Sequence, residues 1–575
     1  MKSFSGISWK TPLIPERLIH KNQQDHNISY LLSKIFLERK FSEDEIHYSL
    51  YKKKLINIEY KNDDLVEASS LLNKCIKQQV NILIFGDYDV DGYSSTYLLY
   101  DYLKSLNISC DFYIPDRFND GYGPNKKLLM NLISKKKYKL VIFVDCGSNS
   151  SNELNILNEK EIKTIVIDHH QIYKKNNATN TIIINPLKNF IKDQYSHLCA
   201  TALVYFFIKY MHNKFIKEIE FNDNKYLFFV ALATISDQMP LRNLNRMIVN
   251  IGLNNFNIKN FSNLKKLIKL KKKISSDDIA YILGPIINSA GRLGYSNLPI
   301  RLFTETDNYN INTISEKLID LNIKRKKIQS VSFNLLNNKI QLENNKVIFI
   351  YEENINEGIL GIVAANFVEF YGKPSFVMTN SNDLIKCSSR SVYGFNIGKL
   401  FNEALSKNIL IKGGGHSMAG GCILYRNKLD IFKNYLNTKF QKSFKNFTAK
   451  NFYTSEQNLD SLKLFAKYDL QKLEPLGNNN INPFFLIKKN KIINAAIAYG
   501  GMSEIPKRAS LIEKKLINSD FSENTFSKAV NFINKDFSPI DDMRASSNYR
   551  LNIAKNLLLK AFYEINNKKI IRIIN

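Results

Sequence analysis

Between residues 80 and 170 the chain alternates short, β-branched apolar runs with longer amphipathic stretches. Three such runs are present, VNILIF (80–85), KLVIFVD (139–145) and KTIVIDHH (163–170). Their continuous apolar character is typical of strands buried on both faces of a parallel sheet. The stretches 95–106 and 125–136 between them carry apolar residues at helical spacing. This succession predicts an α/β fold built on a parallel sheet.

Acidic and imidazole side chains follow each predicted strand. Because ligands gather at the carboxyl ends of strands in open parallel sheets, these side chains are candidates for one site. A further aspartate follows the apolar run YLFFVALATI (226–235). The candidates are Asp87, Asp89 and Asp91 in FGDYDVDG, Asp145 in VDCGS, Asp168, His169 and His170 in IDHHQ, and Asp237 in ATISDQMPL.

Carboxylates crowded in this way repel each other, which costs stability unless a positive charge lies among them. Carboxylates with one or two imidazoles and no thiolate suit Mn²⁺ or Mg²⁺ better than zinc. Two such ions about 4 Å apart would neutralise the aspartates and position a water and a phosphate oxygen. A lone aspartate at a strand end is usually a helix cap or turn residue, and an isolated histidine pair is more often surface or core filler than a ligand. Their coincidence in one βα region favours a metal site.

The rest of the chain divides into a helical region and a second α/β region. Residues 195–335 are mostly helical in pattern, and 311–340 is long, amphipathic and free of glycine and proline. We therefore expect a connecting helix there. The run 345–353 is typical of a strand, and 358–372 of a helix that glycine ends.

Composition limits the partners and the compartment. The net charge of +28 and pI near 9.5 favour a polyanionic partner such as nucleic acid, although the abundance of lysine, asparagine and isoleucine explains part of the excess equally well. The six cysteines are far apart without a C-x-x-C pair, which fits a reducing cytoplasm. The longest apolar runs are shorter than the roughly 18 residues of a membrane span, so we expect a soluble, cytoplasmic protein without a membrane partner.

Seven segments, in order, resemble motifs of a known enzyme family. FGDYDVDGYSS, VDCG, DHH and ATISDQMPL resemble the four motifs of the DHH phosphoesterase superfamily, and GGGHSMAGG (413–421) resembles the glycine-rich motif of its associated second domain. IPDRFNDGYGPN (114–125) and GPIINSAGRLG (284–294) are similar to segments of the RecJ single-stranded-DNA-specific exonucleases. The resemblance covers about residues 1–490.

The resemblance implies roles for the candidates. Two divalent cations, Mn²⁺ or Mg²⁺, would be bound by Asp89, Asp91, Asp145, His169 and Asp237. His170, Asp145 and Asp87 would be catalytic, with His170 contacting the scissile phosphate or positioning the attacking water. Asp168 would hold an imidazole rather than touch metal.

The second domain would grip the substrate. Its glycines would let backbone N–H groups approach a polyanion, although a glycine cluster alone is more often a turn. Arginine forms bidentate pairs with phosphate oxygens, so arginines in the matching segments are candidate phosphate ligands. The expected substrate-binding residues are Arg117, Arg292, Ser389, Arg390, Gly414, Gly415 and His416.

Two departures from the family pattern concern this grip. Residues 387–391 read CSSRS, where the family usually has Gly-Ser-Gly-Arg-Ser. Asn356 occupies the usual position of a histidine, and asparagine cannot shuttle a proton. Either change would slow turnover or loosen binding without touching the expected metal ligands.

The tail departs further. Residues 473–487 resemble the start of the RecJ oligonucleotide-binding region, but the expected barrel strands do not follow. Instead 495–517 and 537–565 resemble the C-terminal domain of the FAD-binding subunit of molybdenum hydroxylases such as xanthine dehydrogenase. The flavin motifs of that subunit lie in a domain with no counterpart here, so we expect no flavin. The alternative is a RecJ tail that has diverged.

These observations predict a metal-dependent 5′-to-3′ exonuclease of single-stranded DNA in repair and recombination. The alternatives are a DHH-family phosphodiesterase of short oligonucleotides or nucleotide phosphates, and a catalytically idle single-strand-binding protein. We expect a monomer that acts on strands with a 5′ end, beside a helicase and a single-strand-binding protein. The predicted domains are an N-terminal extension (1–70), the DHH domain (71–310), the connecting helix (311–340), the DHH-associated domain (341–445), a partial oligonucleotide-binding region (446–491) and an α+β tail (492–575).

Overall fold

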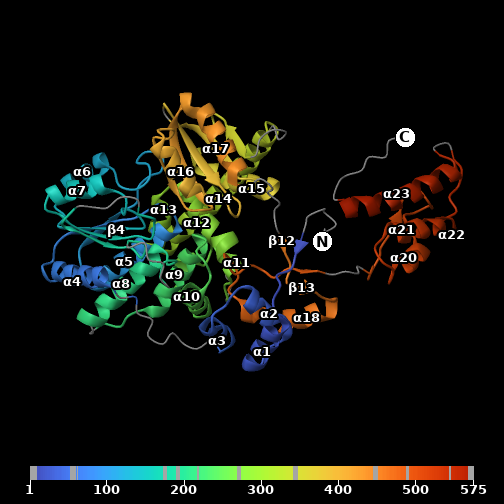
Figure 1. The fold of residues 1–575 in the computed structure, drawn as a ribbon, viewed down its shortest axis with the longest axis horizontal. Coiled ribbons are helices and arrows are strands. Elements are labelled where there is room, and N and C mark those ends of the chain that lie inside the picture. Colours follow the sequence, from blue (N-terminus) through green and yellow to red (C-terminus); the bar gives the residue numbers. More distant parts are fainter. Residues whose placement is uncertain are drawn as a thin grey trace. The chain divides into compact units, whose positions relative to one another are not determined.

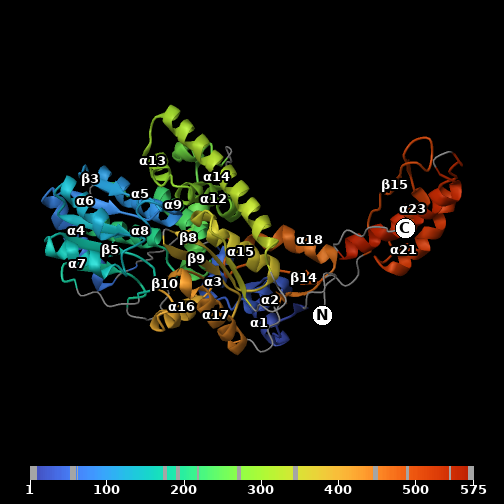
Figure 2. The same ribbon diagram turned by 90° about the horizontal axis from the view of Figure 1, so that it is seen from above.

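The structure is a computed structural model that describes residues 9–51, 60, 62–172, 178–188, 195–216, 219–268, 273–340, 347–381, 383–443, 451–486, 491–542 and 545–567. Its contacts divide the chain into two compact units (Figures 1 and 2). The larger unit comprises Ser42–Phe447 and Leu473–Asn482, and the smaller unit comprises Met1–Phe41, Thr448–Lys472 and Pro483–Asn575. The domain boundaries expected from the sequence stay predictions.

The larger unit contains the predicted parallel sheet, with strand order β3-β2-β4-β5-β6. Side chains of β2 alternate between two cores, with Ile82 and Ile84 on one face and Leu83 and Phe85 on the other. Burial on both faces explains why the sequence has no polar alternation here. The strands are β2 (Ile82–Phe85), β3 (Cys110–Tyr113), β4 (Leu140–Val144), β5 (Lys163–Ile167) and β6 (Thr181–Ile184).

Helices cover both faces of this sheet (Figure 1). The face with α6 (Lys126–Lys135) and α7 (Ser151–Glu159) has the smaller core. The opposite face carries α4 (Asp63–Lys77), α5 (Val90–Ser105), α8 (Ala200–Phe215), α9 (Asp223–Ser236) and α10 (Asn243–Asn254). The remaining helices before the linker are α3 (Glu43–Tyr51), α11 (Ser276–Asp278), α12 (Gly284–Arg292) and α13 (Asn297–Thr304).

The first predicted helix, 95–106, begins earlier than its apolar pattern indicates. Helix α5 starts at Val90 because Asp89 caps it, accepting hydrogen bonds from Asp91 N and Gly92 N at 3.0 Å each. The first turn therefore contains Asp91. The aspartates after β2 thus lie partly in the loop and partly on the helix.

Helix α14 (Asn308–Asn337) is the predicted connecting helix, and it leads to a second sheet of order β10-β11-β9-β8-β7. Only β7 and β8 pair in parallel. The strands are β7 (Ile348–Tyr351), β8 (Ser375–Ser381), β9 (Leu384–Arg390), β10 (Lys412–Gly415) and β11 (Ala419–Tyr425), with helices α15 (Leu360–Tyr371), α16 (Ile397–Ser406) and α17 (Leu429–Ser443). Residues 345–346 of the predicted strand lie outside the described residues.

The smaller unit has short strands and a helical tail. Strands β1 (Trp9–Lys10) and β12 (Asn451–Phe452) pair in parallel, as do β13 (Ser455–Glu456) and β14 (Phe485–Leu486). Its helices before the tail include α1 (Glu16–His26), α2 (Tyr30–Glu38) and α18 (Leu459–Tyr468). The tail has its own apolar core, with β15 (Ala498–Tyr499), β16 (Lys507–Arg508), α20 (Ser510–Leu516), α21 (Glu523–Ala529), α22 (Ile533–Asp536) and α23 (Ser547–Asn567). The predicted α+β tail is confirmed.

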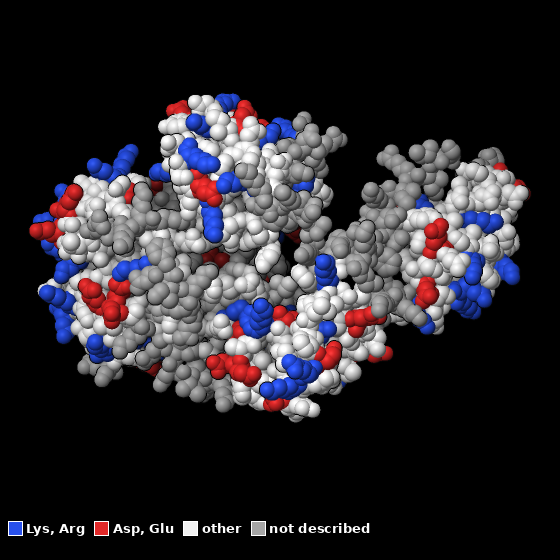
Figure 3. Space-filling model, viewed as in Figure 1, with Lys and Arg blue, Asp and Glu red and all other residues white. Residues whose placement is uncertain are grey.

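The surface carries charges of both signs. Figure 3 shows lysine and arginine interspersed with aspartate and glutamate on the visible face. This distribution fits the interpretation that part of the positive excess lies on solvated faces. None of the helices that the structure describes has the length and apolar character that crossing a membrane requires.

Glu45, on α3, forms hydrogen bonds with residues at the start of α10. Its carboxylate accepts two hydrogen bonds of 2.7 Å from Arg242 and one of 2.7 Å from Asn243 N. Burial alone would raise the pKa of Glu45, but the bonds from Arg242 and the backbone outweigh burial and hold that pKa below its ordinary value of 4.5. The stabilisation that the Glu45–Arg242 pair gives the larger unit therefore depends on pH.

We expect Glu45→Gln to lower the free energy of unfolding by roughly 2 kcal/mol at pH 7, because charged hydrogen bonds are stronger than neutral ones. The depressed pKa means that this contribution is present above the unfolded pKa and is lost as pH falls through the folded pKa. Urea denaturation should show the difference between wild type and variant shrinking below pH 4.5. Glu316→Gln, at an exposed pair with Lys266, is the control and should change little. A difference that is constant with pH would contradict the assignment.

Candidate metal centre

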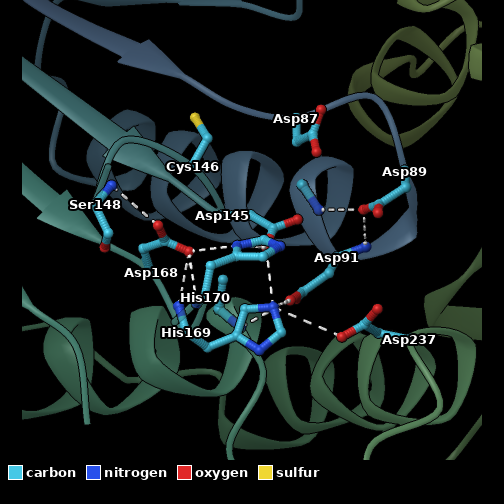
Figure 4. Close-up of polar contacts among 12 residues, drawn as sticks. Asp87, Asp89, Asp91, Asp145, Cys146, Ser148, Asp168, His169, His170 and Asp237 are labelled. Atoms are coloured by element: carbon cyan, nitrogen blue, oxygen red, sulfur yellow. Dashed lines mark hydrogen bonds and ion pairs between the residues drawn. The ribbon is translucent and has the colours of Figure 1, made fainter. Parts of the chain in front are cut away.

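The loop after β2 and the first turn of α5 hold three aspartates close together. Asp87 and Asp91 are 3% and 1% exposed. A Cβ at Gly92 would lie 2.4 Å from the carbonyl oxygen of Asp87, so glycine is required for the chain to turn this tightly. Figure 4 shows Asp87, Asp89 and Asp91 around the start of α5.

Asp145 follows β4 and turns toward the same place. Its backbone is left-handed, with φ of 61°, and its N–H donates to Ile167 O at 3.0 Å, which ties the turn to β5. Its Oδ1 is buried and has no hydrogen-bond partner among the described residues. A buried carboxylate oxygen without a hydrogen bond calls for a partner, and a cation is one candidate.

The two histidines have different partners. His170 Nδ1 lies 2.7 Å from Asp168 Oδ1, which also accepts from His169 N at 2.8 Å and His170 N at 3.1 Å. The other oxygen of Asp168 accepts from Ser148 N at 3.1 Å. Asp168 therefore orients the His170 ring and the loop, as expected for a residue that supports an imidazole.

His169 is where the distant carboxylates meet. Its Nε2 lies 3.3 Å from Asp145 Oδ1, 3.6 Å from Asp237 Oδ2 and 3.7 Å from Asp91 Oδ2 (Figure 4). Within the described residues, three groups of ligating atoms lie within 4.8 Å of one another. They are Asp145, His169 and His170; Asp91, His169 and Asp237; and Asp87, Asp89 and Asp145.

Electrostatics favours a cation in this cluster. Burial and the neighbouring aspartates raise the pKa of Asp145 well above its usual value. Burial, followed by the charge of Asp89, raises the pKa of Asp87 to about 7. Burial opposes protonation of His170, but Asp168 outweighs it and raises the pKa of His170 to about 10. Hard oxygen ligands with one imidazole are the donor set of Mn²⁺ or Mg²⁺, and the residues fit two such ions.

A cluster of guanidinium groups lies within the same unit. Arg292 Nη1 donates to Gly358 O at 3.1 Å, and Arg117 lies over the Tyr88 ring at 4.4 Å. Burial, then the charges of Arg117, Arg390 and Arg325, lowers the pKa of Arg292 to about 9. None of these four arginines forms an ion pair with a carboxylate in the part of the chain that the structure describes. Uncompensated guanidinium groups are suited to phosphate.

The second sheet brings the glycine-rich motif to the histidines. The His416 ring lies 6.3 Å from the His170 ring, nearly parallel to it at 24°. Gly415 has a φ of 148° and lies on β10 beside Gly414. A Cβ at Gly361, in the first turn of α15, would lie 3.1 Å from Arg390 Nη2, so this guanidinium is beside a helix N-terminus.

Ser389, a predicted substrate-binding residue, and Asn356, a departure from the family pattern, both form hydrogen bonds with nearby backbone groups. The buried Ser389 hydroxyl donates to Gly420 O at 2.9 Å, which joins β9 to β11. Asn356 Oδ1 accepts from Gly358 N at 2.8 Å and caps the 3₁₀ turn Glu357–Ile359. Both side chains thus shape the backbone beside Arg390 and Arg292.

The sequence analysis missed residues that support the aspartates from other elements. Val90 N donates to Asn288 Oδ1 at 3.1 Å, so α12 helps cap α5. Asp91 accepts hydrogen bonds from Ala200 N and Thr201 N at the start of α8. Asn288 lies in the recognised segment GPIINSAGRLG, but no local pattern marks Thr201 in its apolar surroundings.

Comparisons with known proteins agree with this geometry. Residues 81–234 match the DHH family, N-terminal domain, and residues 344–442 match the DHHA1 domain. Residues 484–565 match the CO dehydrogenase flavoprotein C-terminal domain. The predicted resemblances of the body and of the tail are confirmed.

Curated relatives are single-stranded-DNA-specific exonucleases named RecJ. That of Bacillus subtilis is 27% identical over 435 residues, 73% of this chain and 54% of the relative. That of Haemophilus influenzae is 27% identical over 392 residues, 64% of this chain and 68% of the relative. The chain thus spans about half the length of the Bacillus protein.

Solved structures confirm the fold. RecJ from Thermus thermophilus in complex with Mn²⁺ has a TM-score of 0.72 and 21% identity, covering 86% of this chain and 72% of its own. An exonuclease RecJ bound to manganese has a TM-score of 0.57 and 24% identity, covering 67% of this chain and 97% of its own.

Gly291 sets how closely α12 approaches the aspartate loop. A Cβ there would lie 2.1 Å from Tyr88 O. Alanine is favoured over glycine inside a helix by about 1 kcal/mol, but this clash with backbone should outweigh that preference. We expect Gly291→Ala to lower the free energy of unfolding by at least roughly 2 kcal/mol, measured by denaturant titration. Gly421→Ala, where the nearest atom would be 3.5 Å away, is the control; equal effects would contradict the close approach.

Proposed function

We propose that this chain, whose sequence and fold resemble those of RecJ exonucleases, is a metal-dependent nuclease that degrades single-stranded DNA from its 5′ end. One observation carries the proposal. A largely buried cluster with excess carboxylates and a partly buried cluster with excess guanidinium groups occur together in the larger unit. Cations would satisfy the first cluster, and the phosphates of a nucleic acid would satisfy the second.

The proposed cation ligands are Asp89, Asp91, Asp145, His169 and Asp237, with Asp87 beside them. Bound Mn²⁺ or Mg²⁺ would activate a water and stabilise the charge that develops on the phosphate oxygens. The Oδ1 of Asp145 supports this assignment, since it accepts no hydrogen bond among the described residues and lies 3.3 Å from His169 Nε2 and 4.0 Å from His170 Nδ1. Hydrolysis of a phosphodiester would occur where these side chains converge.

His170 would contact the reacting phosphate. Asp168 holds its Nδ1, and its Nε2 faces the Tyr122 hydroxyl at 3.4 Å. A ring held in this way donates a hydrogen bond in a fixed direction. We assign it to a phosphate oxygen rather than to the attacking water. His416 would approach the same phosphate from the second sheet.

The arginines would hold the strand. Arg292, Arg390 and Arg117 would bind phosphates together with the first turn of α15, where free N–H groups and the helix dipole attract anions. Gly414 and Gly415 would let the backbone approach the strand closely. Ser389 would act indirectly, through the β9–β11 pairing that places Arg390.

A role in DNA repair and recombination, in the cytoplasm and as a monomer, is part of the proposal. A helicase would supply the single strand, and a single-strand-binding protein would share it.

We propose no flavin for the tail, and a visible absorption spectrum with a flavin band would overturn that. Rates on a dinucleotide and on a long strand separate this function from hydrolysis of short oligonucleotides. Salt-dependent binding without hydrolysis would indicate an idle binding protein.

Asp145→Asn should reduce nucleotide release at least about 100-fold, because it removes charge from the cation site without changing its shape. The substrate is a long single strand labelled at either end, with Mn²⁺ supplied to chelator-treated protein. A 5′ label should leave as a mononucleotide first. Asp111→Asn is the control and should keep full activity. Asp111 lies on β3 and forms an ion pair with Lys136. Release of the 3′ label first would refute the direction.

Arg390→Lys should raise KM for single-stranded DNA roughly tenfold with a smaller change in kcat, since lysine cannot pair bidentately with phosphate. Arg426→Lys, at an exposed pair with Glu353 beside the same sheet, is the matched control. Steady-state kinetics on a defined oligonucleotide measure both variants. An unchanged KM in Arg390→Lys would contradict the proposed role of Arg390 in binding the strand.

A further inference from the structure

Asp91 is held by three donors from the start of α8. Its Oδ1 accepts hydrogen bonds from the Thr201 hydroxyl at 2.6 Å and from Thr201 N at 2.8 Å. Its Oδ2 accepts from Ala200 N at 2.8 Å. These contacts link residues 110 and 109 positions apart in the chain. The carboxylate of one helix thus caps the N-terminus of another.

The beginning of α8 lacks a cap of its own. Cys199, the N-cap residue, makes no side-chain capping bond, so the first amides of α8 depend on Asp91. A helix N-terminus attracts a carboxylate through its free N–H groups and its dipole. The two amides alone would complete such a cap. The Thr201 hydroxyl adds a third, shorter bond in a turn whose other side chains are apolar.

This third bond distinguishes the two oxygens of Asp91. Oδ1 receives two donors, whereas Oδ2 receives one. Oδ2 is also the oxygen that faces His169 Nε2, at 3.7 Å. The group Asp91, His169 and Asp237 is one of those that could hold a cation. The more lightly bonded oxygen is therefore the one directed at the cation position.

We propose that Thr201 is a positioning residue that directs Oδ2 of Asp91 toward the cation shared with His169 and Asp237. The inference rests on the proposed metal-dependent function. Thr201 touches neither the cation position nor the substrate; it acts by fixing the carboxylate. Supporting partners of this kind change metal affinity about 10- to 100-fold when they are removed.

The test uses Mn²⁺ alone and the full-length protein. Thr201→Val removes the hydroxyl and keeps the shape of the side chain, whereas Thr201→Ser keeps the hydroxyl. Thr201→Ala also removes the hydroxyl, and its smaller side chain cannot clash with neighbouring atoms. Electron paramagnetic resonance of free Mn²⁺ gives the Kd without any substrate. We expect the valine and alanine variants to bind roughly tenfold more weakly, and the serine variant to bind within about twofold of wild type.

Thr234→Val is the matched control, because Thr234 is also buried and its hydroxyl faces the Cys199 thiol, at 3.5 Å, and forms no hydrogen bond with Asp91 among the described residues. Wild-type affinity in both Thr201→Val and Thr201→Ala would overturn the inference, as would an equal loss in Thr234→Val. In an Asp91→Ala background, Thr201→Val should cause no further loss; a full additional loss would also overturn it. If the wild type binds no Mn²⁺, the proposed function fails instead, so the two failures are distinguishable.

Discussion

Mutual repulsion among buried carboxylates is the constraint on which the larger unit depends. Three elements bring acidic side chains to His169, namely α5, the turn after β4 and the end of α9, and several of the aspartates are fixed by bonds that are independent of any cation. Asp89 caps its own helix, Asp91 caps a neighbouring one, and the turn at Asp145 is tied to β5. Each support compensates part of the repulsion, and the orphaned oxygen of Asp145 marks what is left for a metal to neutralise.

Two charge excesses of opposite sign explain why a polyanion suits this unit. The two groups compensate each other only in part: burial outweighs both the effect of Arg117, which lowers the pKa of Asp87, and that of Asp89, which raises the pKa of Arg292. In the proposed function, a phosphodiester strand would bring negative charge to the arginines while its phosphate oxygens would approach the bound cations. A Cβ at Gly361 would lie 3.1 Å from the Arg390 guanidinium, and a Cβ at Gly358 would lie 2.0 Å from the backbone oxygen of Arg292, so both glycines allow close packing beside these arginines.

The sequence was most informative where the signal is local. Continuous apolar runs predicted β2, β4 and β5, and the motifs after them identified the residues that meet at His169. Strands β3 and β6, at the two margins of the sheet, were not predicted; the β3 run CDFY is weakly apolar, whereas the β6 run TIII is apolar but only four residues long. The early start of α5 was missed because a cap, not an apolar pattern, sets it. Thr201 and Asn288 act on residues more than 100 positions away, and no spacing rule detects such contacts.

The tail illustrates the modular history that such a chain permits. Its buried side chains, among them Ile512, Phe526 and Phe562, form a cluster that shares no member with the cores around the two sheets. Amino-acid replacements in that cluster can therefore accumulate without disturbing the packing of the residues that surround His169. A segment packed in this way can be acquired, altered or exchanged during evolution while the ancestral chemistry elsewhere in the polypeptide persists.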